Sequence, residues 1–206
     1  MKHATSRELY GYWNRVRNGA PAPRRSDIEP SDLRRILADT FILEVADRGT
    51  YPVRLAGTRI CGVYGREIKG DDFLDFWSAQ DRDAMATLGT AVAADAAAAV
   101  VSVLARTARD RSVPCELLIL PLRHNGPGYD RILGSFATLD QPYWLGTESI
   151  VEQTITSLRL IWPDEQPQFL RRSSDRLAEE IPAPIPFPVP DRRKRGHLTV
   201  FDGGKQ

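Results

Sequence analysis

The sequence is poor in the residues on which disulfide-stabilised and metal-dependent proteins rely. It contains two cysteines, Cys61 and Cys115, and three histidines among 206 residues. Two cysteines cannot form the disulfide framework of a small secreted domain, and none of these side chains has a second ligand at the spacing of a zinc site. We therefore expect free thiols, a reducing, cytoplasmic setting, and no metal site.

Long apolar runs are also missing. The least polar stretch, residues 91–104, is mostly alanine and is interrupted by Asp95. The first residues, MKHATSRELYGYW, lack the apolar run of a signal peptide, and no segment has the roughly 18 apolar residues of a membrane-spanning helix. The sequence therefore predicts neither a signal peptide nor a membrane span.

The chain has no strong excess of charge and no common catalytic motif. Lys and Arg number 28 and Asp and Glu number 27, which argues against a dedicated nucleic-acid binder. The GxSxG, HExxH, P-loop and GxGxxG patterns are all absent. We expect a protein without catalytic activity.

The residues that are present predict an α+β domain. A helix over 5–18 is followed by a second short helix after Pro30, two strands, several short helices broken by glycine and a longer helix over 78–97. The predicted strands are 40–45, 51–56, 100–107, 115–123 and 131–139. This order predicts a five-stranded antiparallel sheet.

The last part of the chain has a different composition. Residues 150–161 have enough apolar side chains for either a helix or a strand. Residues 181–190, IPAPIPFPVP, favour polyproline II or extended backbone, and the basic DRRKR follows. We expect a disordered tail over 163–206, which serves either as a linker or surface strap or as a docking segment.

The sequence contains RLAGTRIC, YGRE, G, F and FW in this order, preceded by YWNRVRNG and PRRSDIEP. This pattern resembles PAS_5, a subfamily of bacterial PAS domains common in alphaproteobacteria. The resemblance covers about residues 5–160 and implies a PAS fold, with helices on one face of the sheet, an N-terminal helix and a Pro-rich C-terminal tail. One departure is Gly57, where many PAS domains have asparagine. The predicted divisions are a helical cap over 1–39, a PAS core over 40–145, an extension packed on it over 146–162, and the tail over 163–206.

The resemblance implies a stand-alone, non-catalytic sensory or regulatory module. It would bind a small ligand, form a homodimer and signal through contact with a partner protein, since no output domain is recognisable. Two alternatives stay open: an interaction scaffold whose core is filled by side chains, and a small enzyme with an open cleft.

The ligand would lie in a cavity between the sheet and the helices. The candidate ligand-binding residues are Leu55, Gly57, Arg59, Ile60, Tyr64, Arg66, Phe73 and Trp77. Arg59 or Arg66 could hold a carboxylate through two parallel hydrogen bonds, or could be a solvated residue at a helix end. The aromatic residues Phe73, Phe76 and Trp77 are expected to pack in the core, although they could still line this cavity.

We expect neither haem nor flavin. No histidine lies on the predicted central helix, where haem-binding PAS domains usually hold their ligand. Cys61 lies in GTRICGVYG, which lacks the asparagine and glutamine of the NCRFLQ-like helix in flavin-linking PAS photoreceptors. A small buried thiol is therefore the expected role of Cys61.

The helix predicted over 5–18 carries an apolar stripe outside the PAS core. Its members are Leu9, Tyr12, Trp13 and Val16. Such a stripe either covers the chain's own sheet or contacts a second subunit, and both alternatives stay open.

Overall fold

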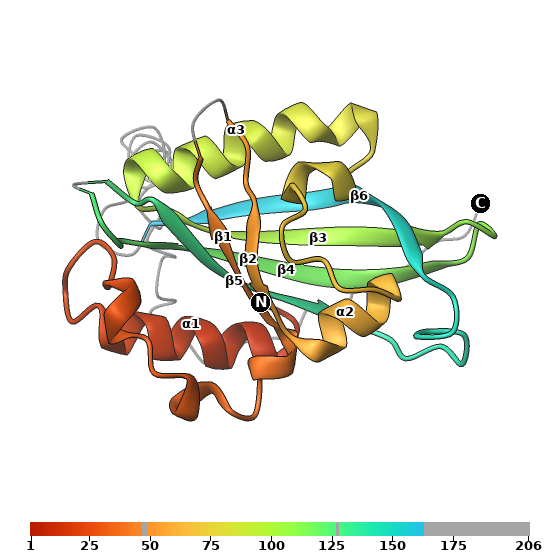
Figure 1. Cartoon of the computed structure of the whole chain (residues 1–206), viewed down its shortest axis with the longest axis horizontal. Coiled ribbons are helices and arrows are strands. Elements are labelled where there is room, and N and C mark those ends of the chain that lie inside the picture. Colours follow the sequence, from red (N-terminus) through yellow and green to blue (C-terminus); the bar gives the residue numbers. More distant parts are fainter. Residues whose placement is uncertain (47–48, 127, 163–206) are drawn as a thin grey trace, which may run out of the picture. The chain divides into compact units, whose positions relative to one another are not determined.

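A six-stranded antiparallel sheet is the centre of the computed structural model, which describes residues 1–46, 49–126 and 128–162 (Figure 1). The strands are β1 (Thr40–Glu44), β2 (Val53–Ala56), β3 (Ala98–Thr107), β4 (Ser112–Leu122), β5 (Arg131–Thr138) and β6 (Ile150–Ile161). Their order across the sheet is β2-β1-β5-β4-β3-β6. The predicted α+β class is therefore confirmed.

The sheet has one strand more than expected. β6 pairs with β3 from Ala98↔Ile161 to Thr107↔Ile150 and forms the edge of the sheet beyond it. The sequence alone allows either a helix or a strand over 150–161, and the β-branched residues of this segment favour the strand. The expectation of five strands is corrected to six.

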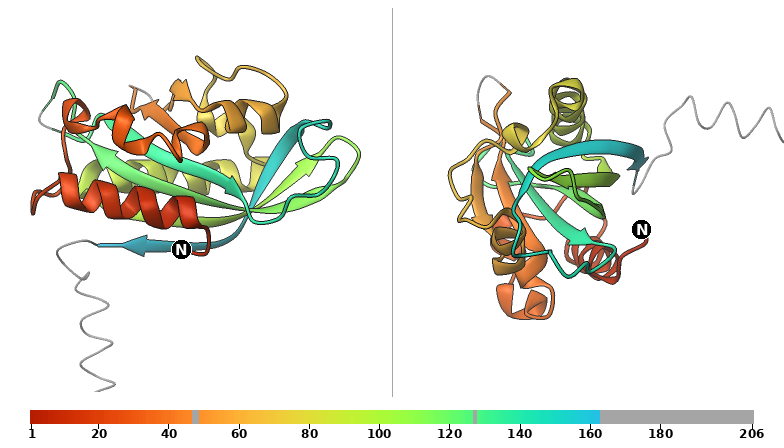
Figure 2. Two further views of the ribbon diagram at one scale, coloured as in Figure 1. Left: turned by 90° about the horizontal axis from the view of Figure 1, so that it is seen from below. Right: turned by 90° about the vertical axis from the view of Figure 1, so that its right-hand side faces the viewer.

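Helices cover both faces of the sheet (Figures 1 and 2). One face carries α2 (Thr58–Tyr64), the 3-10 segment η4 (Phe73–Phe76) and α3 (Ala79–Asp95). The opposite, outer face carries α1 (Ala4–Val16), followed by the 3-10 segments η1 (Arg25–Asp27), η2 (Pro30–Leu33) and η3 (Leu37–Asp39). Both faces of the central strands are consequently buried.

The apolar stripe of α1 belongs to the core of the chain itself. Leu9, Tyr12 and Trp13 are at most 5% exposed and pack with outer-face residues of the sheet. The Trp13 indole N–H donates a hydrogen bond of 2.9 Å to the carbonyl oxygen of Pro121. Val16 is half-buried beside the same cluster. The stripe therefore covers its own sheet, and the alternative of a dimer contact is corrected, because Leu9, Tyr12 and Trp13 are already buried within the chain.

A buried glutamate anchors the start of α1 to the sheet. Glu116 of β4 is 2% exposed and accepts hydrogen bonds from the backbone N–H groups of Lys2, at 2.5 Å, and His3, at 3.0 Å. Burial opposes ionisation, but these bonds and the N-terminal ammonium outweigh it and lower the pKa of Glu116. The charged carboxylate thus holds the N-terminal segment in place.

This anchor should make stability depend on pH. A glutamate whose pKa is lowered by folding stabilises the protein above its ordinary pKa of 4.5, and that stabilisation is lost as the pH falls through the lowered value. In Glu116→Gln, the fall in melting temperature below about pH 4.5 should be smaller than in the wild type. Glu8→Gln, at an exposed position of α1, is the control and should keep the wild-type pH profile. Identical profiles for Glu116→Gln and the wild type would contradict this role.

The predicted tail over 163–206, including the Pro-rich run 181–190 and the basic run 191–195, lies outside the described residues. Within the part of the chain that is described, no helix is both long and apolar enough to cross a membrane.

Candidate functional site

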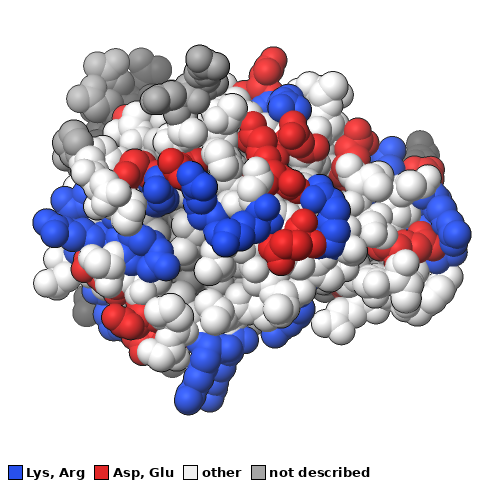
Figure 3. All heavy atoms as spheres, in the orientation of Figure 1, with Lys and Arg blue, Asp and Glu red and all other residues white. Residues whose placement is uncertain are grey.

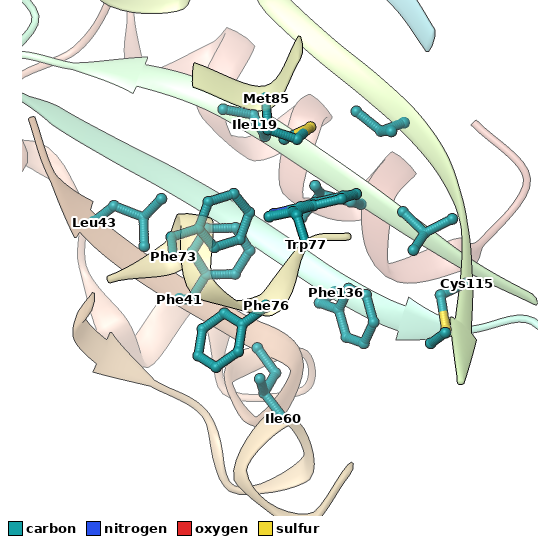
Figure 4. Packing of buried hydrophobic residues seen from close by; sticks show 14 of the residues in the cluster. Phe41, Leu43, Ile60, Phe73, Phe76, Trp77, Met85, Cys115, Ile119 and Phe136 are labelled. Atoms are coloured by element: carbon teal, nitrogen blue, oxygen red, sulfur yellow. The ribbon is translucent and has the colours of Figure 1, made fainter. Parts of the chain in front are cut away.

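Aromatic side chains converge between the sheet and the segment from α2 to η4 (Figure 4). Phe73 lies at the centre of this aromatic cluster, with its ring centroid 5.7 Å from that of Phe41 and 5.8 Å from that of Trp77. The Tyr64 and Phe76 rings are closer still, at 4.6 Å. The acidic cap Asp72 accepts a hydrogen bond from the N–H of Leu74 and so begins η4. This turn directs Phe73, Phe76 and Trp77 into the interior.

The aromatic cluster fills most of the interior. One small cavity there has a volume of about 20 Å³. It is lined by Phe41, Leu43, Val53, Ile60, Tyr64, Ile68, Phe73, Phe76 and Phe136. Such a volume is close to that of a single water molecule, so as packed here the interior holds no space for a larger ligand.

Polar groups nevertheless lie at the edge of this cluster. The side-chain amide of Gln153, on β6, donates a hydrogen bond to the Tyr64 hydroxyl. Gln153 Oε1 and the Trp77 indole N–H are both buried, and neither has a hydrogen-bond partner among the described residues. The backbones of Trp77 and Gln153 are bridged, so the two unpaired groups belong to neighbouring residues. Burial without a partner typically costs about 1–3 kcal/mol per group.

Ionisable groups in this region are held in their neutral forms. Burial raises the pKa of the Tyr64 hydroxyl far above its ordinary value, with a smaller contribution from Cys115. Burial likewise raises the pKa of the Cys115 thiol to about 12. Both groups stay protonated at neutral pH, so they can hydrogen-bond but do not act as anions.

The structure separates the eight candidate ligand-binding residues into three places. Ile60, Tyr64, Phe73 and Trp77 meet in the interior. Leu55 and Gly57 line a hollow near the outer face. The two arginines lie at the surface in ion pairs, Arg59 with Asp39 and Arg66 with Asp71, each at 2.5 Å. Their side chains are 63% and 56% exposed, and neither lines the interior cavity.

Gln153 is the buried polar residue that the sequence reasoning missed. Its segment could not be assigned to a helix or a strand, so its facing could not be deduced. Residues two apart in a strand face the same side of the sheet, so a strand assignment would have placed Gln153 and Ile155 on one face. Within the described residues, no group of three or more His, Cys, Asp or Glu side chains is placed to hold a metal ion.

Several solved structures share similarity with the chain. A light-oxygen-voltage (LOV) domain studied with a flavin analogue is 16% identical, with a TM-score of 0.43, over 55% of this chain and 85% of that one. A LOV protein of Rhodobacter sphaeroides is 17% identical, with a TM-score of 0.42, over 56% and 71%. The blue-light photoreceptor Aureochrome1 LOV is 15% identical, with a TM-score of 0.41, over 54% and 88%.

These neighbours correct the expectation about cofactors. Flavin was not expected, because the Cys61 helix lacks the NCRFLQ-like pattern. The expectation of no flavin is contradicted by these neighbours, which are LOV proteins, one of them studied with a flavin analogue. A flavin ring system exceeds the 20 Å³ interior cavity, so its binding there would require displacement of the aromatic side chains that line it.

No curated protein matches the chain. A family model does match it: PAS_5, described as a PAS domain, over residues 1–137. That match spans more than half of the chain and includes both the N-terminal cap and most of the sheet. The chain therefore belongs to the PAS_5 family of PAS domains.

Proposed function

We propose that the chain is a non-catalytic sensory or regulatory module that binds a small ligand at the aromatic cluster and signals through contact with a partner protein. The observation that carries the proposal is the pair of unpartnered buried groups, Gln153 Oε1 and the Trp77 N–H. One is an acceptor and the other a donor. A flat ligand that offers both a donor and an acceptor would satisfy them and stack on the surrounding rings.

Binding would couple the interior to the surface of the domain. Because the interior cavity is small, a ligand must displace aromatic side chains of η4 or α2. Trp77 and the N-terminus of α3 are tied to β6 through the bond from Ser78 N to Gln153 O, at 2.9 Å. A ligand between them would favour one packing of helix and strand over another, to the extent that it binds one packing more tightly. A partner that contacts β6 or α3 could detect this change.

The test begins with the purified full chain. Native mass spectrometry and a visible absorption spectrum report a retained ligand, flavin included. A thermal-shift screen of aromatic and heteroaromatic metabolites, with flavins among them, then identifies compounds that raise the melting temperature. Any hit should bind up to about tenfold more weakly to Gln153→Met and to Trp77→Phe, since each variant removes a group that would hydrogen-bond the ligand.

Gln80→Met is the matched control, because it makes the same replacement at an exposed position of α3. It should bind the hit like the wild type. If no compound is retained or shifts the melting temperature, the ligand-binding function is wrong. The small cavity would then favour the alternative of an interaction scaffold whose interior is filled by its own side chains.

A further inference from the structure

A second and larger hollow lies on the other side of the sheet, where the N-terminal cap meets β1 and β2. Its volume is about 450 Å³, within the range of sites for drug-sized molecules. It is lined by Arg25, Ile28, Pro30, Leu33, Arg34, Leu37, Ala38, Thr40, Ile42, Leu55, Ala56, Gly57, Thr58 and Leu133. None of these residues lines the interior cavity, so the outer hollow is a separate site.

The walls of the outer hollow are mainly apolar. Ile42 and Leu133 form its floor from the outer face of β1 and β5, and Leu33 contributes from η2. Leu55 of β2 is 39% exposed, one of the large apolar side chains that the described fold leaves in contact with water. An apolar occupant would remove this surface from water, which is favourable in proportion to the area covered.

Among the described residues, the charged side chains that line the outer hollow are all basic. Arg25 and Arg34 line it, and no described Asp or Glu does. Other arginines nearby in space are neutralised, for example Arg59 by Asp39 and Arg54 by Glu44. By contrast, the side chains of Arg25 and Arg34 form no ion pair or hydrogen bond with any described residue. Figure 3 shows Lys and Arg side chains across the face that carries β1 and β2, with Asp and Glu side chains between and above many of them.

We propose that the outer hollow binds a free amphipathic carboxylate, of the medium-chain fatty acid type. Its apolar body would cover Leu55, Ile42 and Leu133, and its carboxylate would pair with Arg25 or Arg34. Guanidinium groups bind carboxylates through two parallel hydrogen bonds, which gives the preference for an anionic head group. A concave site of this volume matches a small molecule better than a flat membrane surface.

Isothermal titration calorimetry with sodium decanoate, below the concentration at which it aggregates, tests the proposal. Decan-1-ol has the same chain without the charge, and acetate has the charge without the chain. Decanoate should bind at least about tenfold more tightly than either, because each lacks one of the two contributions. Arg25→Ala/Arg34→Ala should weaken decanoate binding by about tenfold or more and leave binding of decan-1-ol unchanged.

Arg82→Ala is the charge-matched control, since this arginine pairs with Asp75 and does not line the outer hollow. Its affinity for decanoate should equal that of the wild type. Leu55→Glu, at the half-exposed wall, should abolish decanoate binding while circular dichroism stays native. Equal affinities for decanoate and decan-1-ol, or an unaltered affinity in the double variant, would overturn the proposal. A dimer that Leu55→Glu converts to a monomer would assign the outer hollow to a second copy of the chain and would also overturn it.

Discussion

Replacement of Trp13 by alanine is expected to lower the free energy of unfolding by about 3–5 kcal/mol, the usual cost of removing a large buried aromatic side chain. Trp13 is fully buried between α1 and the outer face of the sheet, and its indole N–H is bonded to Pro121 O. The variant leaves a cavity between α1 and the outer face of the sheet, and the carbonyl oxygen of Pro121 loses its hydrogen-bond donor. Both effects act in the same direction.

Chemical denaturation followed by circular dichroism measures this loss, because the signal does not depend on tryptophan fluorescence. Tyr143→Ala is the control: its aromatic side chain is 86% exposed, and its removal should change stability by less than about 0.5 kcal/mol. An unchanged unfolding curve for Trp13→Ala, together with a change from dimer to monomer in light scattering, would show that α1 contacts a second subunit instead.

The sequence predicted the stripe of α1 but not the surface that it covers. The spacing of Leu9, Tyr12 and Trp13 follows from helical geometry alone. Whether a stripe packs inside or outside the protomer depends on the apolar residues of the facing strand. The run LLILPL over 117–122 of β4 held this information, since a continuous apolar strand is buried on both faces. This apolar run implied that other elements pack on each face of the sheet, and α1 is the helix that packs on the outer face.

The interior was predictable in type but not in detail. The aromatic residues Phe73 and Trp77 follow turn-forming residues in a PAS-like pattern, and the structure brings them together with Ile60 and Tyr64. The hydrogen-bond partner of the Tyr64 hydroxyl is the side-chain amide of Gln153, 89 residues further along the chain. Pairings at such separations depend on strand register, which local sequence patterns do not encode when the strand itself is ambiguous.

The two arginines show the same limitation in electrostatics. The sequence placed Arg59 and Arg66 beside an apolar pocket, where an anion would be their natural partner. The fold supplies carboxylates for both, from the end of η3 and from the loop before η4. A guanidinium that is already paired has less to gain from an external anion. Whether an arginine can bind an external anion therefore depends on the neighbours that folding supplies. For this reason Arg25 and Arg34 became candidates for carboxylate binding only in the structure.

Gly57→Ala is expected to destabilise the protein by about 1–3 kcal/mol, the usual cost of forcing extra atoms into a packed region. Gly57 precedes α2 and donates a hydrogen bond of 2.8 Å from its N–H to Thr40 O. A Cβ atom here would lie less than 3.0 Å from backbone atoms of Leu37 and Ala38. Backbone atoms cannot rotate away as a flexible side chain can, so η3 and the start of α2 would have to separate. The asparagine of many PAS domains would meet the same obstacle.

Gly62→Ala provides a control within α2 itself. A Cβ at Gly62 would meet nothing within 4 Å, and alanine favours the helix by roughly 0.5–1 kcal/mol over glycine. The two identical replacements, five residues apart, should therefore change the denaturation midpoint in opposite directions. Equal denaturation midpoints for Gly57→Ala and the wild type would show that η3 can move away from residue 57 without loss of stability. Because Leu37, Ala38 and Gly57 all line the outer hollow, the separation that Gly57→Ala imposes should also alter decanoate affinity, whereas Gly62→Ala should leave it unchanged.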